Sequence, residues 1–337
     1  MLQRIIAGAV GVLVAAATLG GCGVAAVGPD DCAHCSTGSV ETSISAADAG
    51  TRTSAPASAP ASTPTSAPVD PAEAATCRAW TAARDQFTQM PTWSAGAGTC
   101  DPGSLPAATR HASLAWVNLY RSMAGLGPVA EAAADVPAAQ GCAVMLERNG
   151  QLTHTPPSSW ACASAAARAG AARSNLSGNV GFPMSPWASA HGWIDEGHDL
   201  TDDLGHRRWL LSPELSTVTY GQTGSFACLT LGLAARDPRA PQWVAWPPAG
   251  WVPTALVGAI WSFSKPGVSA AGTTVQVFRD GAPVAVAAGA RRSGYGDDTV
   301  SWEVPSVTAG SVYRVRVAVP GAAAVEYDVR PTTCAPR

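Results

Sequence analysis

Every aromatic residue of this 337-residue chain lies at or after Trp80, and this uneven distribution is the feature that most constrains what the chain can fold into. The 12 tryptophans, 5 tyrosines and 5 phenylalanines are the largest apolar side chains available for a core. Alanine, serine, threonine, proline and glycine dominate residues 23–76 instead, and such a segment cannot bury enough apolar surface to fold. We therefore expect a disordered tether over residues 23–76 and folded structure from Cys77 onward.

The charge of the chain argues against nucleic acid as a partner. There are 21 lysines and arginines and 24 aspartates and glutamates, which gives a net charge of −3, and only 13% of residues are charged. A protein that binds DNA or RNA needs clustered basic side chains to neutralise phosphates. No basic cluster of that kind occurs in the sequence.

The N-terminus has the pattern of an export signal. Arg4 is followed by an apolar run, Ile5–Leu19, which is shorter than the roughly 20 residues that a membrane-spanning helix needs. The sequence Leu19-Gly20-Gly21-Cys22 resembles a bacterial lipobox, which implies a signal peptide over residues 1–22 and acylation of Cys22. A cleaved signal with an incidental cysteine is the alternative. We expect an extracytoplasmic protein of the cell envelope, held by its lipid on the outer face of the cytoplasmic membrane.

The remaining eight cysteines are an even number, which suits disulfide formation in an oxidising compartment. We predict that neighbours in sequence pair, giving Cys77–Cys100 and Cys142–Cys162, with Cys228–Cys334 tying two domains together. Cys32 and Cys35 lie in the tether without a second pair nearby. A local disulfide is therefore favoured over a redox or metal-binding pair at that point.

Residue periodicity predicts two folded domains. Over residues 77–236 we expect an α+β domain with helices at about 109–124, 131–148 and 185–196 and a β-like stretch at 216–232. Over residues 241–337 the pattern changes to a period of two, as in Tyr313–Val319, with turn signals such as Asp280-Gly281. This second part predicts a small immunoglobulin-like β-sandwich.

Four short segments of the first domain contain residue types that bind ligands or metals. They are Gln151–His154, Ser174–Leu176, Trp193–Glu196 and Gly205–Leu211. Asn118-Leu119-Tyr120-Arg121, Leu152-Thr153-His154, Trp193 with Glu196, and Gly205-His206-Arg207 follow one another in an order and spacing similar to the CAP superfamily (cysteine-rich secretory proteins, antigen 5 and pathogenesis-related 1), especially its bacterial branch. The resemblance covers about residues 108–235.

This resemblance implies an α-β-α sandwich with a central cleft in which two histidines and two acidic residues converge. His154 and His206 match the two histidines, and Glu196 matches the acid that follows the tryptophan. The family's Gly-Glu-Asn is replaced by Arg173-Ser174-Asn175, so that Ser174 stands where the first acid would be. We take His154, Ser174, Asn175, Glu196 and His206 as the candidate cleft residues.

The candidate metal ligands are His154, Glu196 and His206, a set that could hold Zn²⁺ or another divalent cation. With Ser174 in place of a carboxylate, weak or absent metal binding is the default expectation, and the sequence demands no cofactor. Asp195 is a rival to Glu196. If the other face of the same helix were buried, His191, Asp195 and His198 would replace the predicted set.

The neighbouring residues have structural interpretations. We expect Trp209, Leu210 and Leu211 to pack beside His206, Arg121 to bond to a carboxylate or to helix-end carbonyls, and Asp202 and Asp203 to lie in a solvated loop. The motifs of serine hydrolases, zinc proteases and nucleotide-binding proteins are absent from the sequence.

Function follows from the anchor, the tether and the cleft. The sequence favours a binding module over an enzyme, with a lipid, a peptidoglycan fragment or a partner protein as its ligand. The β-sandwich would then be an adhesion or spacer unit. A metal-assisted hydrolase of peptide or cell-wall bonds is the alternative function, and a purely structural role in the envelope is a third.

Overall fold

A mixed four-stranded sheet forms the centre of the first half of the folded chain. In the computed structural model, which describes residues 70–87, 92–178, 184–196 and 203–334, its strands follow the order β1-β3-β4-β2. Strands β3 and β4 form an antiparallel hairpin, β2 is antiparallel to β4, and β1 is parallel to β3. Their bounds are β1 Ala130–Glu131, β2 Ser174–Gly178, β3 Leu215–Gln222 and β4 Phe226–Leu233. The predicted signal peptide, Cys22, Cys32, Cys35, His198, Asp202 and the predicted tether up to residue 69 lie outside the described residues. The last six residues of the tether predicted over 23–76 belong instead to helix α1, Pro71–Phe87.

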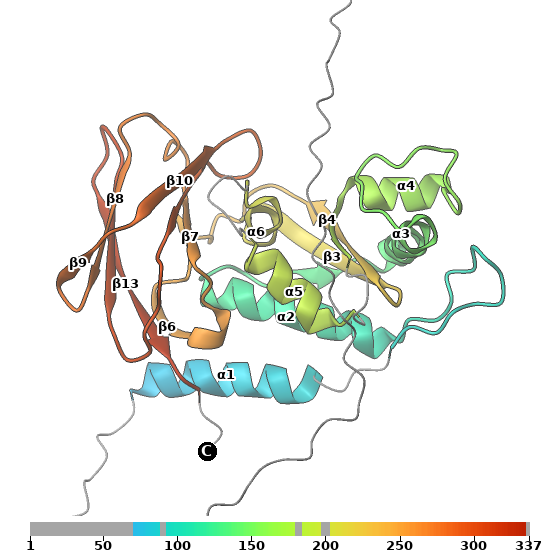
Figure 1. Cartoon of the computed structure of the whole chain (residues 1–337), viewed down its shortest axis with the longest axis horizontal. Coiled ribbons are helices and arrows are strands. Elements are labelled where there is room, and N and C mark those ends of the chain that lie inside the picture. The colour runs from blue at the N-terminus through green and yellow to red at the C-terminus, as the bar shows by residue number, and fades with distance from the viewer. Residues whose placement is uncertain (1–69, 88–91, 179–183, 197–202, 335–337) are drawn as a thin grey trace, which may run out of the picture. The chain divides into compact units, whose positions relative to one another are not determined.

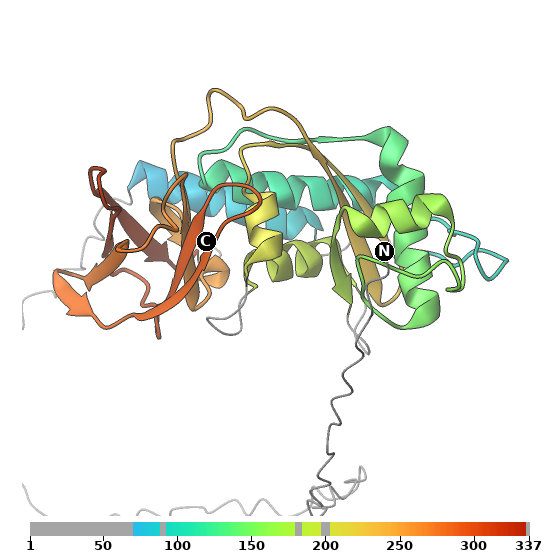
Figure 2. The ribbon, with the colours of Figure 1, turned by 90° about the horizontal axis from the view of Figure 1, so that it is seen from above.

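Helices cover both faces of this sheet (Figures 1 and 2). Side chains of α2 and α5 share one core with β3, whereas α3 and α4 form a second core with β2 and β4. A sheet that is covered on both faces buries most residues of its central strands, as seen in β3 and β4. The helices are α2 Ala107–Met123, α3 Val136–Asn149 with the preceding 3₁₀ turn Ala133–Asp135, α4 Ala165–Ala172, α5 Pro186–Ile194 and α6 Gly205–Leu210.

Capping residues set the limits of these helices. Ser185 caps α5 by accepting a hydrogen bond from the Ala188 amide (3.1 Å), and Gly150, with φ of 62°, ends α3 where the sequence predicts a helix exit. The helix predicted at 131–148 begins later because Ala130 and Glu131 pair with β3 as strand β1. The helix predicted at 185–196 ends at Ile194, so Glu196 lies beyond it.

Two sheets make up the β region, residues 244–332. One has the order β10-β11-β7-β5 and the other β6-β13-β12-β8-β9. The period-two pattern is confirmed in β12, where Tyr313, Val315 and Val317 are buried, and the Tyr313 ring meets Trp261 of the other sheet at 5.6 Å. The bounds are β5 Val244–Trp246, β6 Gly250–Pro253, the 3₁₀ turn Thr254–Leu256, β7 Ile260–Ser264, β8 Thr274–Arg279, β9 Ala282–Val284, β10 Ala287–Arg292, β11 Thr299–Glu303, β12 Tyr313–Ala318 and β13 Val325–Thr332.

Helix α1, Pro71–Phe87, joins the start of the described chain to its end (Figure 1). It lies along strand β6 and helix α2, and the Trp80 ring meets the Trp116 ring edge-on at 5.6 Å. A disulfide links Cys77 of α1 to Cys334, just after β13. All described residues fall in one compact unit that begins at Thr65. None of the described helices is both long enough and apolar enough to span a bilayer.

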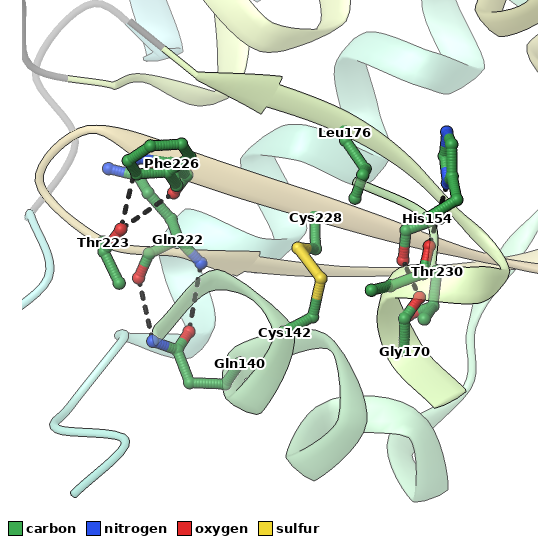
Figure 3. Close-up of a disulfide and its surroundings, with 12 residues drawn as sticks. Gln140, Cys142, His154, Gly170, Leu176, Gln222, Thr223, Phe226, Cys228 and Thr230 are labelled. Atoms are coloured by element: carbon green, nitrogen blue, oxygen red, sulfur yellow. Dashed lines mark hydrogen bonds between the residues drawn. A yellow bond between two sulfur atoms is a disulfide. The ribbon is translucent and has the colours of Figure 1, made fainter. Parts of the chain in front are cut away.

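The predicted disulfide pairing is wrong in all three cases. The bonds are Cys77–Cys334, Cys100–Cys162 and Cys142–Cys228. Pairing by sequence neighbourhood fails because the buried face of α3 places Cys142 against β4, where Cys228 lies 86 residues further along the chain (Figure 3). Cys162, in the loop after α3, bonds instead to Cys100 in the loop before α2.

A hydrogen-bonded pair of glutamines also holds α3 to the central sheet. The Gln140 side chain of α3 donates to the Gln222 carbonyl (2.8 Å) and accepts from the Gln222 amide (3.1 Å), as Figure 3 shows. This pairing continues the hydrogen bonding of strand β3 onto a helix side chain, so α3 is held to the sheet by covalent, polar and apolar contacts.

Removing the buried disulfide should destabilise the protein strongly. For Cys142→Ala with Cys228→Ala we expect the free energy of unfolding to fall by about 2–5 kcal/mol, because the unfolded chain gains entropy and the core loses packed sulfur. Guanidinium unfolding measures this loss. The matched control is Cys100→Ala with Cys162→Ala, which opens a loop of 62 residues at a less buried site. An equal or larger loss in that control would contradict the role given to the buried bond.

Candidate ligand-binding cleft

His206 and Glu196 form a hydrogen-bonded pair at the junction of α5 and α6. The Nδ1 atom of His206, the second residue of α6, lies 2.7 Å from Glu196 Oε2. The other carboxylate oxygen, Oε1, accepts a hydrogen bond from the Arg207 amide at 2.6 Å. Both oxygens of Glu196 are therefore engaged, and the imidazole is held with its Nδ1–H toward Glu196, while its Nε2 has no hydrogen-bond partner among the described residues.

The Arg207 side chain holds the junction of α5 and α6 in place. Its guanidinium is buried and donates to the carbonyls of Ile194 (2.6 Å), Glu196 (3.1 Å) and Ile260 (2.9 Å) and to Ser262 Oγ (3.2 Å). Burial lowers the pKa of Arg207 to about 10, which leaves it charged at neutral pH. One side chain thus ties the end of α5 and the start of α6 to strand β7 of the β region.

The turn into α6 is unusually constrained. Leu204 is buried and has a left-handed backbone conformation with φ of 53°, which a residue with a side chain rarely adopts. The preceding residue, Asp203, accepts a hydrogen bond through Oδ1 from the Gly205 amide (2.9 Å). The turn therefore places Asp203 and His206 on the same side of the chain junction, where both line one hollow.

A cleft of about 550 Å³ opens beside the His206–Glu196 pair. Residues from separate elements line it: the loop after α3 provides His154, strand β2 provides Ser174 and Asn175, and α6 provides His206. Its full lining is His154, Ala172, Arg173, Ser174, Asn175, Glu196, Asp203, Gly205, His206, Trp209, Leu231, Leu233 and Tyr295. The structure thus brings all five candidate cleft residues to one hollow, whose lining also includes the apolar residues Trp209, Leu231 and Leu233.

Neighbouring groups orient the other polar residues of the cleft. His154, which is labelled in Figure 3, donates through Nδ1 to the Ala171 carbonyl at the end of α4 (2.9 Å). Asn175 Nδ2 donates to the His206 carbonyl (3.2 Å), which joins β2 to α6. Ser174 is buried, and its hydroxyl donates to the Gly170 carbonyl (2.7 Å). Ser174 is therefore occupied by a structural hydrogen bond.

Arg173 brings a guanidinium to the rim of the cleft, but its charge is already paired. Arg173 Nη1 donates to Asp135 Oδ2 (2.9 Å), and Nη2 contacts the other carboxylate oxygen. This pairing lowers the pKa of Asp135 and raises the pKa of Arg173. Arg173 consequently adds little net positive charge to the cleft.

The two described members of the alternative set, His191 and Asp195, do not reach the cleft. His191 Nδ1 lies 3.2 Å from the Tyr120 hydroxyl, and its ring stacks on Trp187 with centroids 5.4 Å apart. Burial lowers the pKa of His191, against the opposing effect of Asp195. Neither His191 nor Asp195 lines the cleft, and of the two neighbouring acids it is Glu196 that does.

Two further predictions can be compared with the structure. Arg121 is predicted to bond either to a carboxylate or to helix-end carbonyls, and it bonds to carbonyls. Its partners are the carbonyl oxygens of Gly127, Leu210, Ser212 and Leu215. The prediction that Asp203 lies in a solvated loop is incomplete, since Asp203, although exposed, lines the cleft.

Several contributors to the cleft lie outside the residues that the sequence predicts for it. Tyr295 belongs to none of the four candidate segments, Trp209 is expected only to pack beside His206, and Leu231 and Leu233 have no predicted role. The available signal for Tyr295 was a large aromatic side chain between two glycines, both of which have positive φ. A turn of this kind places its aromatic side chain at the surface of the molecule, where such residues commonly contact a ligand or another element.

The donor set does not fit a three-ligand metal centre as it is arranged. Within the parts of the chain that the structure describes, no group of three or more histidine, cysteine, aspartate or glutamate side chains is placed to hold a metal ion. His206 and Glu196 are bonded to each other, and His154 lies elsewhere on the same cleft wall. We therefore derive no chemical step that passes through a metal.

Comparison with known proteins finds a family match for part of the chain. Residues 114–224 match the family model CAP, described as the cysteine-rich secretory protein family, and this supports the CAP superfamily assignment for that span. The matched span contains His154, Glu196 and His206 and excludes Tyr295 and the whole β region. No curated protein matches the chain.

Replacing Arg207 should destabilise the whole junction. For Arg207→Met we expect a loss of about 3 kcal/mol or more in the free energy of unfolding, because several buried acceptors lose their donor. Thermal or denaturant unfolding measures this loss. Arg239→Met is the matched control, since the Arg239 side chain is 89% exposed and its removal should change stability by less than about 0.5 kcal/mol. Equal stability of the two variants would contradict the structural role of Arg207.

Zinc should bind weakly or not at all to the purified protein. Calorimetric titration of Zn²⁺ should show no stoichiometric tight binding, since the only acid among the candidate ligands, Glu196, already accepts two hydrogen bonds. Parallel titrations of His154→Ala and His206→Ala serve as controls and should look like the wild type. Tight one-to-one binding that both substitutions abolish would show that the histidines and Glu196 rearrange into a metal site.

Proposed function

We propose that this chain is an exported, lipid-anchored CAP-domain protein that binds a ligand outside the cytoplasm in the cleft beside His206. The observation that carries the proposal is the cleft itself, where His154, Glu196 and His206 face an apolar wall across a hollow of about 550 Å³. That volume lies in the range of small-ligand sites, which combine apolar walls with a few polar groups. CAP-family proteins are commonly extracellular, which agrees with the proposed location.

The chemistry of the cleft favours binding over bond cleavage. Glu196 already accepts hydrogen bonds at both oxygens, and Ser174 donates its hydroxyl proton to a backbone carbonyl. Neither is therefore poised as a free general base or an activated nucleophile. The alternative function, a metal-assisted hydrolase of peptide or cell-wall bonds, draws support from one observation: Glu196 orients His206 through Nδ1, and no described residue bonds to its Nε2, the atom that a general base would use.

The membrane anchor is part of the same proposal and rests on the sequence. Cys22, in Leu19-Gly20-Gly21-Cys22, would carry the acyl chains, and the part of the predicted tether that precedes α1 would let the folded unit stand away from the surface. The β region, whose two sheets are consistent with an immunoglobulin-like sandwich, would act as a spacer or adhesion unit.

Substitution of the anchoring cysteine should release the protein. We expect Cys22→Ser to abolish incorporation of radiolabelled palmitate and to move the protein from the membrane fraction into the soluble fraction, because acylation needs the thiol. Cys35→Ser is the control and should stay in the membrane fraction. Unchanged labelling and membrane association of Cys22→Ser would contradict lipid anchoring.

A retention experiment tests the binding function. Immobilised protein should retain at least one of three envelope samples, namely lipid vesicles, cell-wall fragments or solubilised envelope proteins, and His206→Ala should reduce retention by about 10-fold or more. His111→Ala is the matched control, since the His111 side chain is 62% exposed and lies outside the cleft. Failure to retain any sample would refute the binding function, whereas cleavage of a sample that His206→Ala abolishes would favour the hydrolase.

A further inference from the structure

One wall of the cleft is supplied by the β region, outside the span that matches the CAP model. Tyr295, between β10 and β11, stacks on Trp209 of α6 with ring centroids 4.6 Å apart and planes at 15°. The Arg208 guanidinium lies over the Tyr295 ring at 4.0 Å and donates to the Tyr295 carbonyl at 2.6 Å. These contacts hold Tyr295 against α6, and both rings of the stacked pair line the cleft.

Tyr295 also fixes a carboxylate. Its hydroxyl donates to Asp203 Oδ2 at 3.3 Å, while Asp203 Oδ1 accepts from the Gly205 amide at 2.9 Å. Burial raises the pKa of Tyr295 to about 12, with smaller effects of Arg208 and Asp203, so the hydroxyl keeps its proton at neutral pH. Tyr295 therefore positions both an aromatic wall and an acid of the cleft.

The space around Gly205 gives independent evidence that α6, Asp203 and Tyr295 pack closely together. A Cβ atom at position 205 would lie 3.0 Å from Asp203 Oδ1 and 3.0 Å from the Tyr295 hydroxyl oxygen. A side chain here would require Asp203 and the Tyr295 hydroxyl to shift by a few tenths of an ångström. Glycine at this position therefore fits the close approach of the β region to α6.

The charges of the cleft disfavour an anionic ligand. Glu196 and Asp203 bring two carboxylates, and the one guanidinium in the lining, Arg173, is already paired with Asp135. A phosphate, sulfate or carboxylate group would face two like charges without a free cation to offset them. The lone pairs that remain on Glu196 and Asp203, together with Nε2 of His206, offer hydrogen-bond acceptors to a ligand rich in hydroxyl donors.

The shape of the site fits a ligand made of several linked rings better than a ligand with one small group. A second hollow of about 440 Å³ adjoins the first and shares Glu196, Asp203 and His206 with it. Its other lining residues include the apolar Leu152, Leu176 and Trp193. The shared polar residues thus lie between two partly apolar hollows. An uncharged sugar chain matches this pattern, because a pyranose ring has an apolar C–H face that packs on an aromatic ring and a rim of hydroxyl donors.

We propose that the ligand of this cleft is an uncharged oligosaccharide and that Tyr295 of the β region is a specificity-determining residue, which positions Trp209 and Asp203 for it. This inference rests on the proposed binding function and names the ligand class of the same site. On this view the β region completes the binding site.

The test uses the full-length protein and three probes of different charge. These are the N-acetylglucosamine tetramer, which is neutral, its deacetylated cationic form, and phosphatidylglycerol vesicles, which are anionic. We expect calorimetry to show binding of the neutral tetramer in preference to both others. Saturation-transfer NMR should show the strongest transfer to the sugar ring C–H protons, and Trp209→Ala should abolish it.

Two substitutions of Tyr295 separate its roles. Tyr295→Phe keeps the stacked ring and loses the hydroxyl, so affinity for the neutral tetramer should fall roughly 3- to 10-fold at an unchanged melting temperature. Tyr295→Ala loses both contacts and should weaken binding by a further factor of about 10. The matched control is Trp187→Ala, which removes a stacked aromatic ring of 40% exposure outside the cleft and should leave affinity unchanged.

The outcomes distinguish this inference from the binding function. Wild-type affinity in Tyr295→Ala, or a preference for the vesicles or the cationic tetramer, overturns the inference and leaves the binding function standing. If Tyr295→Ala does not fold, the affinity of Tyr295→Phe decides. Retention of an envelope sample without any binding of the neutral tetramer refutes the ligand class alone, whereas failure of the retention experiment as well refutes both.

Discussion

The guanidinium of Arg207 lies buried where the end of α5, the start of α6 and strand β7 meet, and the arrangement of the cleft depends on it. A buried cation must find hydrogen-bond acceptors, and here it finds three backbone carbonyls and one hydroxyl from two distant parts of the chain. The Arg207 amide also donates to Glu196. The same residue thus fixes the carboxylate that orients His206 and the strand that brings the β region to the cleft.

The two faces of the central sheet serve different purposes. On the face covered by α3 and α4, the Cys142–Cys228 disulfide and the Gln140–Gln222 pair lock helix to sheet, which makes that side a rigid support. The junction of α5 and α6 carries instead a left-handed leucine and a histidine–carboxylate pair. Constrained backbone and polar side chains gather where a ligand can enter, as is common at functional sites.

The β region changes what the cleft can bind. Within the span that matches the CAP model, the cleft would have His154, Glu196 and His206 with an open side next to Trp209. Tyr295 covers part of that side with an aromatic ring and holds Asp203 in place through its hydroxyl. Asp203 is therefore a second acid in the cleft beside Glu196, even though Ser174 does not supply one. The selectivity of the site is consequently a property of both parts of the chain.

Local patterns determined much of this protein. The absence of aromatic residues before Trp80 located the folded part, the Asn149-Gly150 exit marked the end of α3, and the alternation in Tyr313–Val319 identified strand β12. The resemblance around Gly205-His206-Arg207 led to the residues that line the cleft. The helix exit, the strand alternation and the Gly205-His206-Arg207 motif each involve only a few neighbouring residues, where helix and strand geometry act directly.

Tertiary structure alone decided which distant residues meet. Disulfide pairing depends on which face of α3 is buried, so Cys142 bonds to Cys228 and not to its neighbour in sequence. The position of Tyr295 depends on where Arg207 anchors β7, which no local pattern in Gly294-Tyr295-Gly296 reveals. Contacts between residues 86 or more positions apart are set by the packing of whole elements, because each must bury its apolar face and satisfy its buried polar groups at the same time.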